Sequence, residues 1–196
     1  MPSARPSFTR AELESYRDAE VPDLLPGPGQ ELRLLFVGIN PGLWTAATQT
    51  HFAHPGNRFY PALLRAGVLT RAVDPAAGMT DEDREHLRER GIGITNLVRR
   101  ATARADELTT DELREGGDRL LATIARTRPA VVAVAGITAY RQAFGVRKAQ
   151  TGEQPEPVEG ARLWVVPNPS GLNAHETVDS LAVAYAEPAR AAGLLD

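Results

Sequence analysis

The residues best suited to chemistry are two asparagines that each follow an apolar stretch and precede a proline. Asn40 comes after Leu34–Ile39 and before Pro41-Gly42, and Asn168 comes shortly after Leu163–Val166 and before Pro169-Ser170-Gly171. An asparagine side chain is both a hydrogen-bond donor and an acceptor, but it cannot take up a proton as a carboxylate can. It can orient a water molecule or recognise a polar ligand, and it is a poor general base.

A turn that only ends a strand is the alternative for each asparagine. Asn, Pro, Ser and Gly populate ordinary loops, and for the segment around Asn40 alone the turn is the favoured interpretation. Two strands that end in the same way instead favour one pocket built from both. A chance pair of turns stays the competing explanation.

The elements that must position these residues follow an α/β pattern. Continuous apolar runs with β-branched members, typical of strands buried on both faces, begin near Leu34, Gly91, Pro129 and Arg162. Helical patterns cover 61–68, 81–90, 111–126, 139–144 and 176–192, the last interrupted or ended near Pro188. We predict a three-layer α/β/α sandwich with a mainly parallel central sheet of about four strands. Such sheets bind ligands at the carboxyl ends of their strands, where both asparagines are expected.

The rest of the chain is assigned around this sheet. Residues 1–30 are expected to form an N-terminal arm, in which Thr9 and Glu12 have the spacing of a capping box, and residues 31–196 a single domain. Residues 151–160 are expected to be a solvent loop. Gly116-Gly117 lies inside a predicted helix, where glycine costs roughly 1 kcal/mol each relative to alanine, so a close packing contact is expected there.

Composition excludes several classes of function. The chain of 196 residues has no cysteine, which rules out disulfides, thiolate metal sites and cysteine nucleophiles. The net charge of −3 neither indicates nor excludes nucleic-acid binding, because a local basic surface decides that. No apolar run reaches the length of a membrane span or a secretory signal. We therefore expect a cytoplasmic protein that does not contact membranes.

Two groups of side chains outside the asparagines could bind ions. His51 and His54 are three residues apart, but no other histidine or carboxylate cluster stands nearby in sequence, so no metal site is expected. Arg99, Arg100 and Arg104 follow the second predicted strand and could hold phosphates beside the pocket. A solvated charged loop is the commoner use of such residues.

Three segments together resemble one protein family. They are Gly38-Ile39-Asn40-Pro41-Gly42-Leu43, Phe52-Ala53-His54-Pro55-Gly56-Asn57-Arg58-Phe59 and Asn168-Pro169-Ser170-Gly171-Leu172. In this order they resemble the mismatch-specific uracil/thymine-DNA glycosylases, a branch of the uracil-DNA glycosylase superfamily. The likeness extends from about Leu32 to Tyr185 and implies an α/β/α fold, in agreement with the pattern above.

The resemblance implies a function in base excision repair. Members flip a mispaired base out of double-stranded DNA and hydrolyse its N-glycosidic bond, leaving an abasic site. The expected substrate is uracil opposite guanine, with thymine or other damaged pyrimidines also considered. No metal or cofactor is implied, and a monomer associated with the nucleoid is expected. A non-catalytic module that binds mismatched or abasic DNA with the same fold is the alternative. A nucleotide-binding protein is disfavoured, because no glycine-rich phosphate loop follows the first strand.

Site residues are assigned by position within the matched motifs. Asn40 matches the residue that positions the attacking water, and Phe52 matches the aromatic that stacks on the base. Gly38, Ile39, Thr45 and Asn168 match the base pocket. The family's intercalation loop corresponds to Ser170, Gly171, Leu172 and Asn173, in which Leu172 is the wedge that enters the base stack.

Two departures from the family pattern bear on this assignment. Trp44 stands where a small residue is common and could reshape the pocket entrance, and Asn173-Ala174 replaces a common Ser-Arg pair, which could weaken a phosphate contact. Asp106 is a further catalytic candidate, because it could supply a carboxylate near the water.

Overall fold

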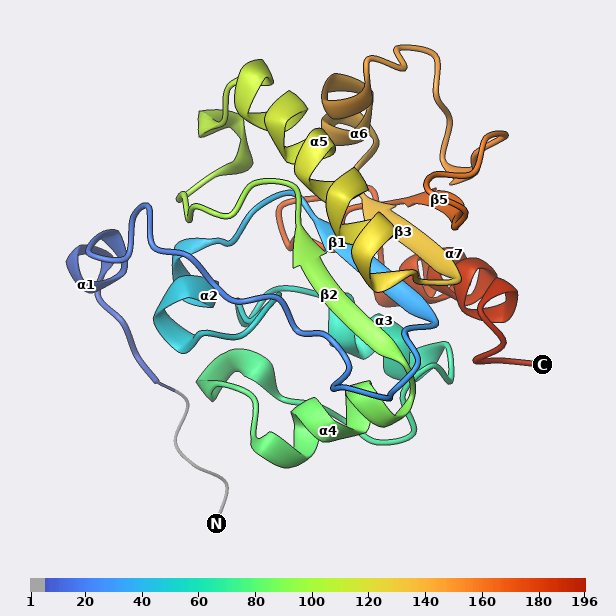
Figure 1. The fold of residues 1–196 in the computed structure, drawn as a ribbon. Helices are drawn as coiled ribbons and strands as arrows, with labels where there is room; N and C mark the ends of the chain where they lie inside the picture. The colour runs from blue at the N-terminus through green and yellow to red at the C-terminus, as the bar shows by residue number, and fades with distance from the viewer. Residues whose placement is uncertain (1–5) are drawn as a thin grey trace.

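Five strands form the central sheet in the order β2-β1-β3-β5-β4. The structure is a computed structural model that describes residues 6–196 (Figure 1). The strands are β1 (Leu34–Gly38), β2 (Ile92–Asn96), β3 (Val131–Ala135), β4 (Gly152–Glu153) and β5 (Arg162–Val166). The α-helices are α1 (Arg10–Glu14), α2 (Leu43–Thr48), α3 (Phe59–Arg65), α4 (Asp81–Glu89), α5 (Thr110–Thr127), α6 (Ile137–Phe144) and α7 (Val178–Ala191), with short 3-10 turns η1 (Pro75–Ala77) and η2 (Ala105–Glu107).

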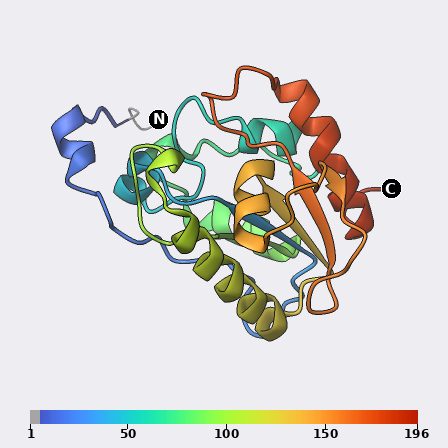
Figure 2. The ribbon, with the colours of Figure 1, turned by 90° about the horizontal axis from the view of Figure 1, so that it is seen from above.

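Helices cover both faces of the sheet, which confirms the predicted three-layer sandwich (Figure 2). Alternate residues of a strand point to opposite faces. Leu34 and Phe36 of β1 therefore join a core with α3, α4 and α7, whereas Leu35 and Val37 join a second core with α5 and α6. All four side chains are completely buried, which explains why β1 is a continuous apolar run.

The four longer strands run parallel, so their carboxyl ends meet at one edge of the sheet. β1 pairs with β2 and β3, and β3 pairs with β5. In the register of β1 and β2, Gly38 lies opposite Asn96. Three asparagines therefore come to this edge. Asn96 is the last residue of β2, and Asn40 and Asn168 follow shortly after the ends of β1 and β5.

The N-terminal segment packs along the β2 side of the domain. The predicted capping box at the start of α1 is confirmed: Thr9 N donates to Glu12 Oε2 at 2.7 Å, and Glu12 N donates to Thr9 Oγ1 at 3.2 Å. Further along, Leu24 exchanges backbone hydrogen bonds with Ile94 of β2 and is buried. The first five residues of the predicted arm lie outside the described residues.

Two elements differ from the sequence-based expectation. The segment expected to be a solvent loop contains β4, which pairs antiparallel with β5 and places Glu153 beside Arg162. A two-residue edge strand has no hydrophobic periodicity, so the sequence does not reveal it. Helix α7 also continues through Pro188 to Ala191, because Leu181, Tyr185 and Ala189 are buried against the sheet and offset the lost backbone hydrogen bond. Within residues 6–196, no helix is long and apolar enough to cross a membrane.

The glycine pair in α5 marks two close contacts, as predicted. A side chain at Gly116 would collide with the backbone carbonyl of Leu97, and a Cβ at Gly117 would lie 3.0 Å from the carbonyl oxygen of Ala143. Helix α5 therefore approaches the segment after β2 more closely than a residue with a Cβ allows, and at Gly117 it leaves little room for a Cβ against the end of α6.

Replacing Gly116 with alanine tests this contact. Helix propensity alone would favour the change by about 1 kcal/mol, but the collision with a backbone atom cannot be relieved by a rotamer, so we expect a net loss of about 1–3 kcal/mol. Urea denaturation measures it, with Glu115→Ala on the exposed side of the same helix as the matched control. A variant as stable as the wild type would contradict the close approach.

Candidate active site

Asn40 is held at the carboxyl edge of the sheet by two hydrogen bonds from its amide nitrogen. Nδ2 donates to the Arg100 carbonyl oxygen at 3.1 Å and to Thr102 Oγ1 at 2.8 Å. Both amide hydrogens are therefore used within the protein, while Oδ1 has no hydrogen-bond partner among the described residues. The side chain is half-buried and presents a fixed acceptor, which is what orienting a water molecule requires.

Thr102 determines which way the Asn40 amide faces. The Thr102 hydroxyl donates its only hydrogen to the Arg104 carbonyl oxygen at 2.7 Å, so towards Asn40 it can only accept. The Arg100 carbonyl is likewise only an acceptor. With the amide reversed, Oδ1 would face two acceptors, so the observed orientation is enforced. The sequence motifs did not reveal Thr102, which is buried in an irregular segment 62 positions from Asn40.

A small group of side chains surrounds Gly38, two residues before Asn40. The Phe52 ring and the Asn96 amide oxygen both lie where a side chain at position 38 would be, with Phe52 Cζ 3.2 Å from that point. Glycine at position 38 leaves the room that the Asn96 amide oxygen occupies, since a Cβ there would collide with it. Gly38, Phe52 and Asn96 thus line one small polar and aromatic site, and Asn96 is a member that the sequence analysis did not include.

Phe52 occupies a constrained position. Its backbone φ of 55° lies in the left-handed region that bulky residues rarely adopt, and its ring stacks on Phe59 with centroids 4.1 Å apart. Thr45 of α2, assigned to the pocket, is buried and accepts a hydrogen bond from Ala53 N at 3.4 Å. It therefore ties α2 to the loop that carries Phe52. A strained backbone such as that of Phe52 is common at functional sites.

His51 fixes the orientation of Asn96. His51 Nε2 lies 2.8 Å from the Pro22 carbonyl oxygen, an acceptor, so Nε2 carries the hydrogen and Nδ1 accepts from Asn96 Nδ2 at 3.2 Å. This leaves the Asn96 carbonyl oxygen directed at Gly38. Burial lowers the pKa of His51, against smaller opposing effects of the Pro22 carbonyl and Asp23. Both ring nitrogens are occupied, so His51 has no lone pair to give a metal.

The loop after β5 is organised by its own hydrogen bonds. Asn168 Oδ1 accepts from Ser170 N at 3.0 Å, Ser170 Oγ accepts from Leu172 N at 3.3 Å, and Asn173 Nδ2 donates to the Asn168 carbonyl at 3.1 Å. Leu172 projects from this framework with 86% of its surface exposed. An isolated, exposed leucine on an ordered loop has the geometry of a wedge.

The three arginines after β2 are already paired with carboxylates. Arg100 binds Glu112 and Asp18, Arg104 binds Asp106, and Arg99 lies 3.7 Å from Asp23. The Arg100 hydrogen bond, followed by that of the Thr109 backbone, lowers the pKa of Glu112 to about 2. Arg100 thus joins the N-terminal segment to α5. Because it is already paired, it is not free to bind a phosphate, which was one of the two roles considered from the sequence.

Asp106 lies in η2 and forms no hydrogen bond with Asn40 among the described residues. Both its oxygens accept from the Arg104 guanidinium, and its side chain is 63% exposed. The groups that contact the Asn40 amide are Arg100 and Thr102 instead. Trp44, the departure next to the first motif, donates its indole N–H to the Ala76 carbonyl at 2.9 Å and packs edge-on against Phe8 and His54.

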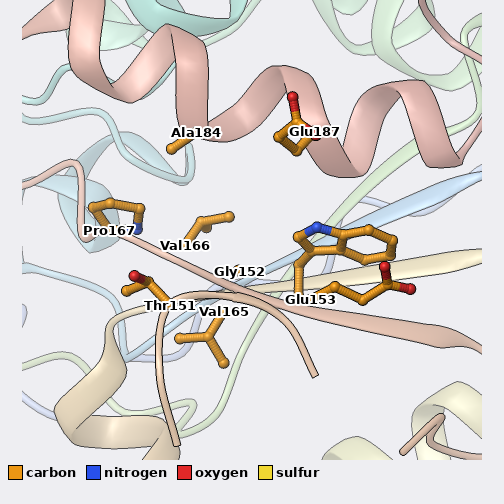
Figure 3. A pocket seen from close by; sticks show the side chains of 9 residues that line it. Thr151, Gly152, Glu153, Val165, Val166, Pro167, Ala184 and Glu187 are labelled. Carbon is orange, nitrogen blue, oxygen red and sulfur yellow. The ribbon is translucent and has the colours of Figure 1, made fainter. Parts of the chain in front are cut away.

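An apolar hollow of about 390 Å³ lies elsewhere, between α7 and the β4–β5 edge (Figure 3). Trp164, Val166, Pro167 and Ala184 contribute to its lining. The two carboxylates of its lining, Glu153 and Glu187, are paired with Arg162 and Arg190. None of the residues predicted to do chemistry lines it, so it is not the candidate site.

Residues 26–187 match the family model of the uracil DNA glycosylase superfamily. The chain belongs to this superfamily. Its members hydrolyse the bond between a base and the sugar of DNA at the start of base excision repair, and this glycosylase accordingly acts on DNA. The superfamily match is broader than the mismatch-specific branch that the motifs resemble.

The predicted site residues fall into two neighbouring groups. Gly38, Phe52 and Thr45 lie around the first motif with Asn40, whereas Asn168 and Ser170–Asn173 form the second loop. Asn96 was recoverable from the sequence, since it ends a predicted strand just as Asn40 and Asn168 follow theirs. No comparable signal marks Thr102 or His51, whose roles depend on partners distant in sequence, Asn40 for Thr102 and the Pro22 carbonyl for His51.

Thr102→Val should slow base excision by this glycosylase by about 10-fold, because Asn40 loses one of the two hydrogen bonds that hold its amide. Thr102→Ser keeps the hydroxyl and should excise at close to the wild-type rate. Single-turnover excision from uracil-containing duplex measures both. Equal rates for Thr102→Val and the wild type would show that the hydroxyl does not orient Asn40.

Stability should fall as the pH drops below about 6.5, the ordinary value for histidine. The pKa of buried His51 is lowered on folding, so the folded state binds fewer protons than the unfolded state and loses stability on acidification. The lowered pKa of His86 acts in the same direction. Urea midpoints at pH 7.5 and 5.5 should differ less in His51→Gln than in the wild type, with exposed His175→Gln as the control. An unchanged difference in His51→Gln would exclude His51 as a source.

Proposed function

We propose that this glycosylase removes uracil mispaired with guanine, as a monofunctional enzyme that leaves an abasic site. The observation that carries the proposal is the fixed Asn40 carbonyl oxygen, two residues from the site formed by Gly38, Phe52 and Asn96. A water acceptor next to an aromatic and amide-lined site suits a flipped pyrimidine.

The chemistry proposed for Asn40 is orientation of water without proton removal. The bond between C1′ of the sugar and N1 of uracil breaks, and its electron pair leaves with the base, where the ring carbonyls share the charge. Water held by Asn40 Oδ1 then adds to C1′ and releases its proton to solvent. Because an amide is a poor base, the rate depends on stabilising the departing anion by hydrogen bonds. Asn168 and backbone groups near Ile39 are the proposed donors.

Selectivity for the mismatch is proposed to arise at the second loop. Leu172 enters the stack where the base has left, and a wobble pair opens more readily than a correct pair. The Asn173 side chain is already bonded at both ends, to the Asn168 carbonyl and to His175 N, so it is not free to pair with guanine. We therefore assign contact with the orphaned guanine to the backbone around Gly171.

Asn40→Ala tests the proposal most directly. We expect single-turnover excision from G·U duplex to fall by about 10²–10⁴-fold, since the water loses its positioning group, while duplex binding stays close to that of the wild type. Duplexes with A·U and G·T and single-stranded uracil define the substrate range. Asp106→Ala, assayed alongside, decides whether that carboxylate assists.

Three outcomes would change the proposal. Comparable excision by Asn40→Ala would remove Asn40 from the mechanism. Equal excision from G·U and A·U by the wild type would remove the mismatch specificity and leave a general uracil excision activity. Tight binding to mismatched or abasic duplex, with no excision of any base by the wild type, would favour a non-catalytic DNA-binding module.

A further inference from the structure

Arg58 connects the loop that carries Phe52 to the loop that carries Leu172. Its Nη1 donates to the carbonyl oxygens of Asn173 at 3.0 Å and Glu176 at 2.8 Å, and its Nη2 lies 3.4 Å from the Gly171 carbonyl oxygen. One guanidinium thus contacts three carbonyls spread over six residues of the second loop. The backbone N–H of Arg58 adds a fourth hydrogen bond, to Pro169 O at 3.0 Å.

These contacts differ from those of the other arginines near the site. Arg99, Arg100 and Arg104 pair with carboxylates, whereas Arg58 forms no ion pair among the described residues and is bound by neutral carbonyls only. Several convergent hydrogen bonds from a rigid, planar group hold a loop in one conformation. A lysine keeps the charge but cannot reproduce this fork.

The two loops also touch through their backbones at Gly171. A Cβ at Gly171 would lie 2.6 Å from the Gly56 carbonyl oxygen, so only glycine permits this approach. On the other side of Arg58, Phe59 supports the Phe52 ring by stacking. Two adjacent residues, Arg58 and Phe59, therefore support the exposed leucine loop and the aromatic of the pocket respectively.

We propose that Arg58 is a positioning residue that holds residues 170–176 ready for insertion into DNA before any DNA binds. The proposal rests on the function proposed above, in which Leu172 is the wedge. Leu172 is so exposed that packing contributes little to fixing its place, so the order of its loop comes mainly from hydrogen bonds. Ordering the loop in advance avoids paying its conformational entropy during base flipping.

A double-mutant cycle with Leu172 tests whether Arg58 acts through the wedge. Arg58→Ala and Arg58→Lys should each slow single-turnover excision from G·U duplex by at least about 10-fold, because the carbonyls lose their shared donor. In a Leu172→Ala background the same substitutions should have little further effect, since the group they position is gone. Arg65→Ala is the matched control: Arg65 is the last residue of α3, whose N-cap is Arg58, and it binds α7 through Asp179 and not the loop.

Amide hydrogen exchange on the DNA-free protein gives a readout that does not need activity. Residues 170–176 should exchange faster in Arg58→Lys and Arg58→Ala than in the wild type, with the strands and Arg65→Ala unchanged. Arg58→Lys keeps the test open if the alanine variant fails to fold.

Two results would overturn the proposal: unchanged protection of residues 170–176, or effects of Arg58 and Leu172 that simply add. Full activity of Arg58→Lys would likewise show that charge alone is needed. A wild type that excises no base would instead refute the proposed function, and the exchange result would still decide whether Arg58 orders the loop.

Discussion

Strand β1 pairs along its length with β2 and over its first four residues with β3, and its side chains from Leu34 to Val37 are completely buried. Every other feature of the site depends on this constraint. A strand paired on both edges and covered on both faces cannot slide or rotate, so the residues that follow it leave the sheet at a fixed point. Gly38 and Asn40 are positioned by this strand, and the parallel pairing brings Asn96 and the arginine-containing loop after β2 beside them.

The arginines near the site form ion pairs within the protein, which stabilise the fold and leave less positive charge for DNA. Arg100 draws Asp18 and Glu112 together and thereby fixes the loop whose carbonyl receives the Asn40 amide. A chain with a net charge of −3 that neutralises these arginines internally has little basic surface left at this loop. In the function proposed above, recognition then draws on shape and on the exposed Leu172, which makes the order of the second loop, held by Arg58, more important.

The layers of the fold could be predicted because the longer strands are continuous apolar runs and the longer helices have an amphipathic period, as β1 and α5 show. Gly116-Gly117 indicated a close contact because glycine lowers the stability of a helix and therefore needs a reason to be there. Two-residue β4 has no period, and the continuation of α7 past Pro188 depends on burial that only the folded protein provides.

Within the site, the motifs identified the residues that face a ligand but not those that hold them. Asn40 and Phe52 stand in recognisable sequence settings, whereas Thr102 contacts Asn40 and His51 contacts the Pro22 carbonyl, partners that lie near them only after folding. Sequence spacing contains no information about such partners. For this reason, motifs predict the side chains that face a ligand but not the residues whose hydrogen bonds hold those side chains in place.

The surroundings of residue 40 explain why it is an asparagine and not the stronger base aspartate. A carboxylate at this place would set the oxygen in the position of Nδ2 against both the Arg100 carbonyl oxygen and Thr102 Oγ1, whose hydrogen is donated to the Arg104 carbonyl. The repulsion would favour the protonated acid, which is not a base. An amide meets both needs, because its nitrogen donates to Arg100 and Thr102 while its oxygen remains an acceptor for a ligand. The hydrogen bonds around position 40 thus disfavour a carboxylate base, and the reaction proposed above draws its rate from departure of the base.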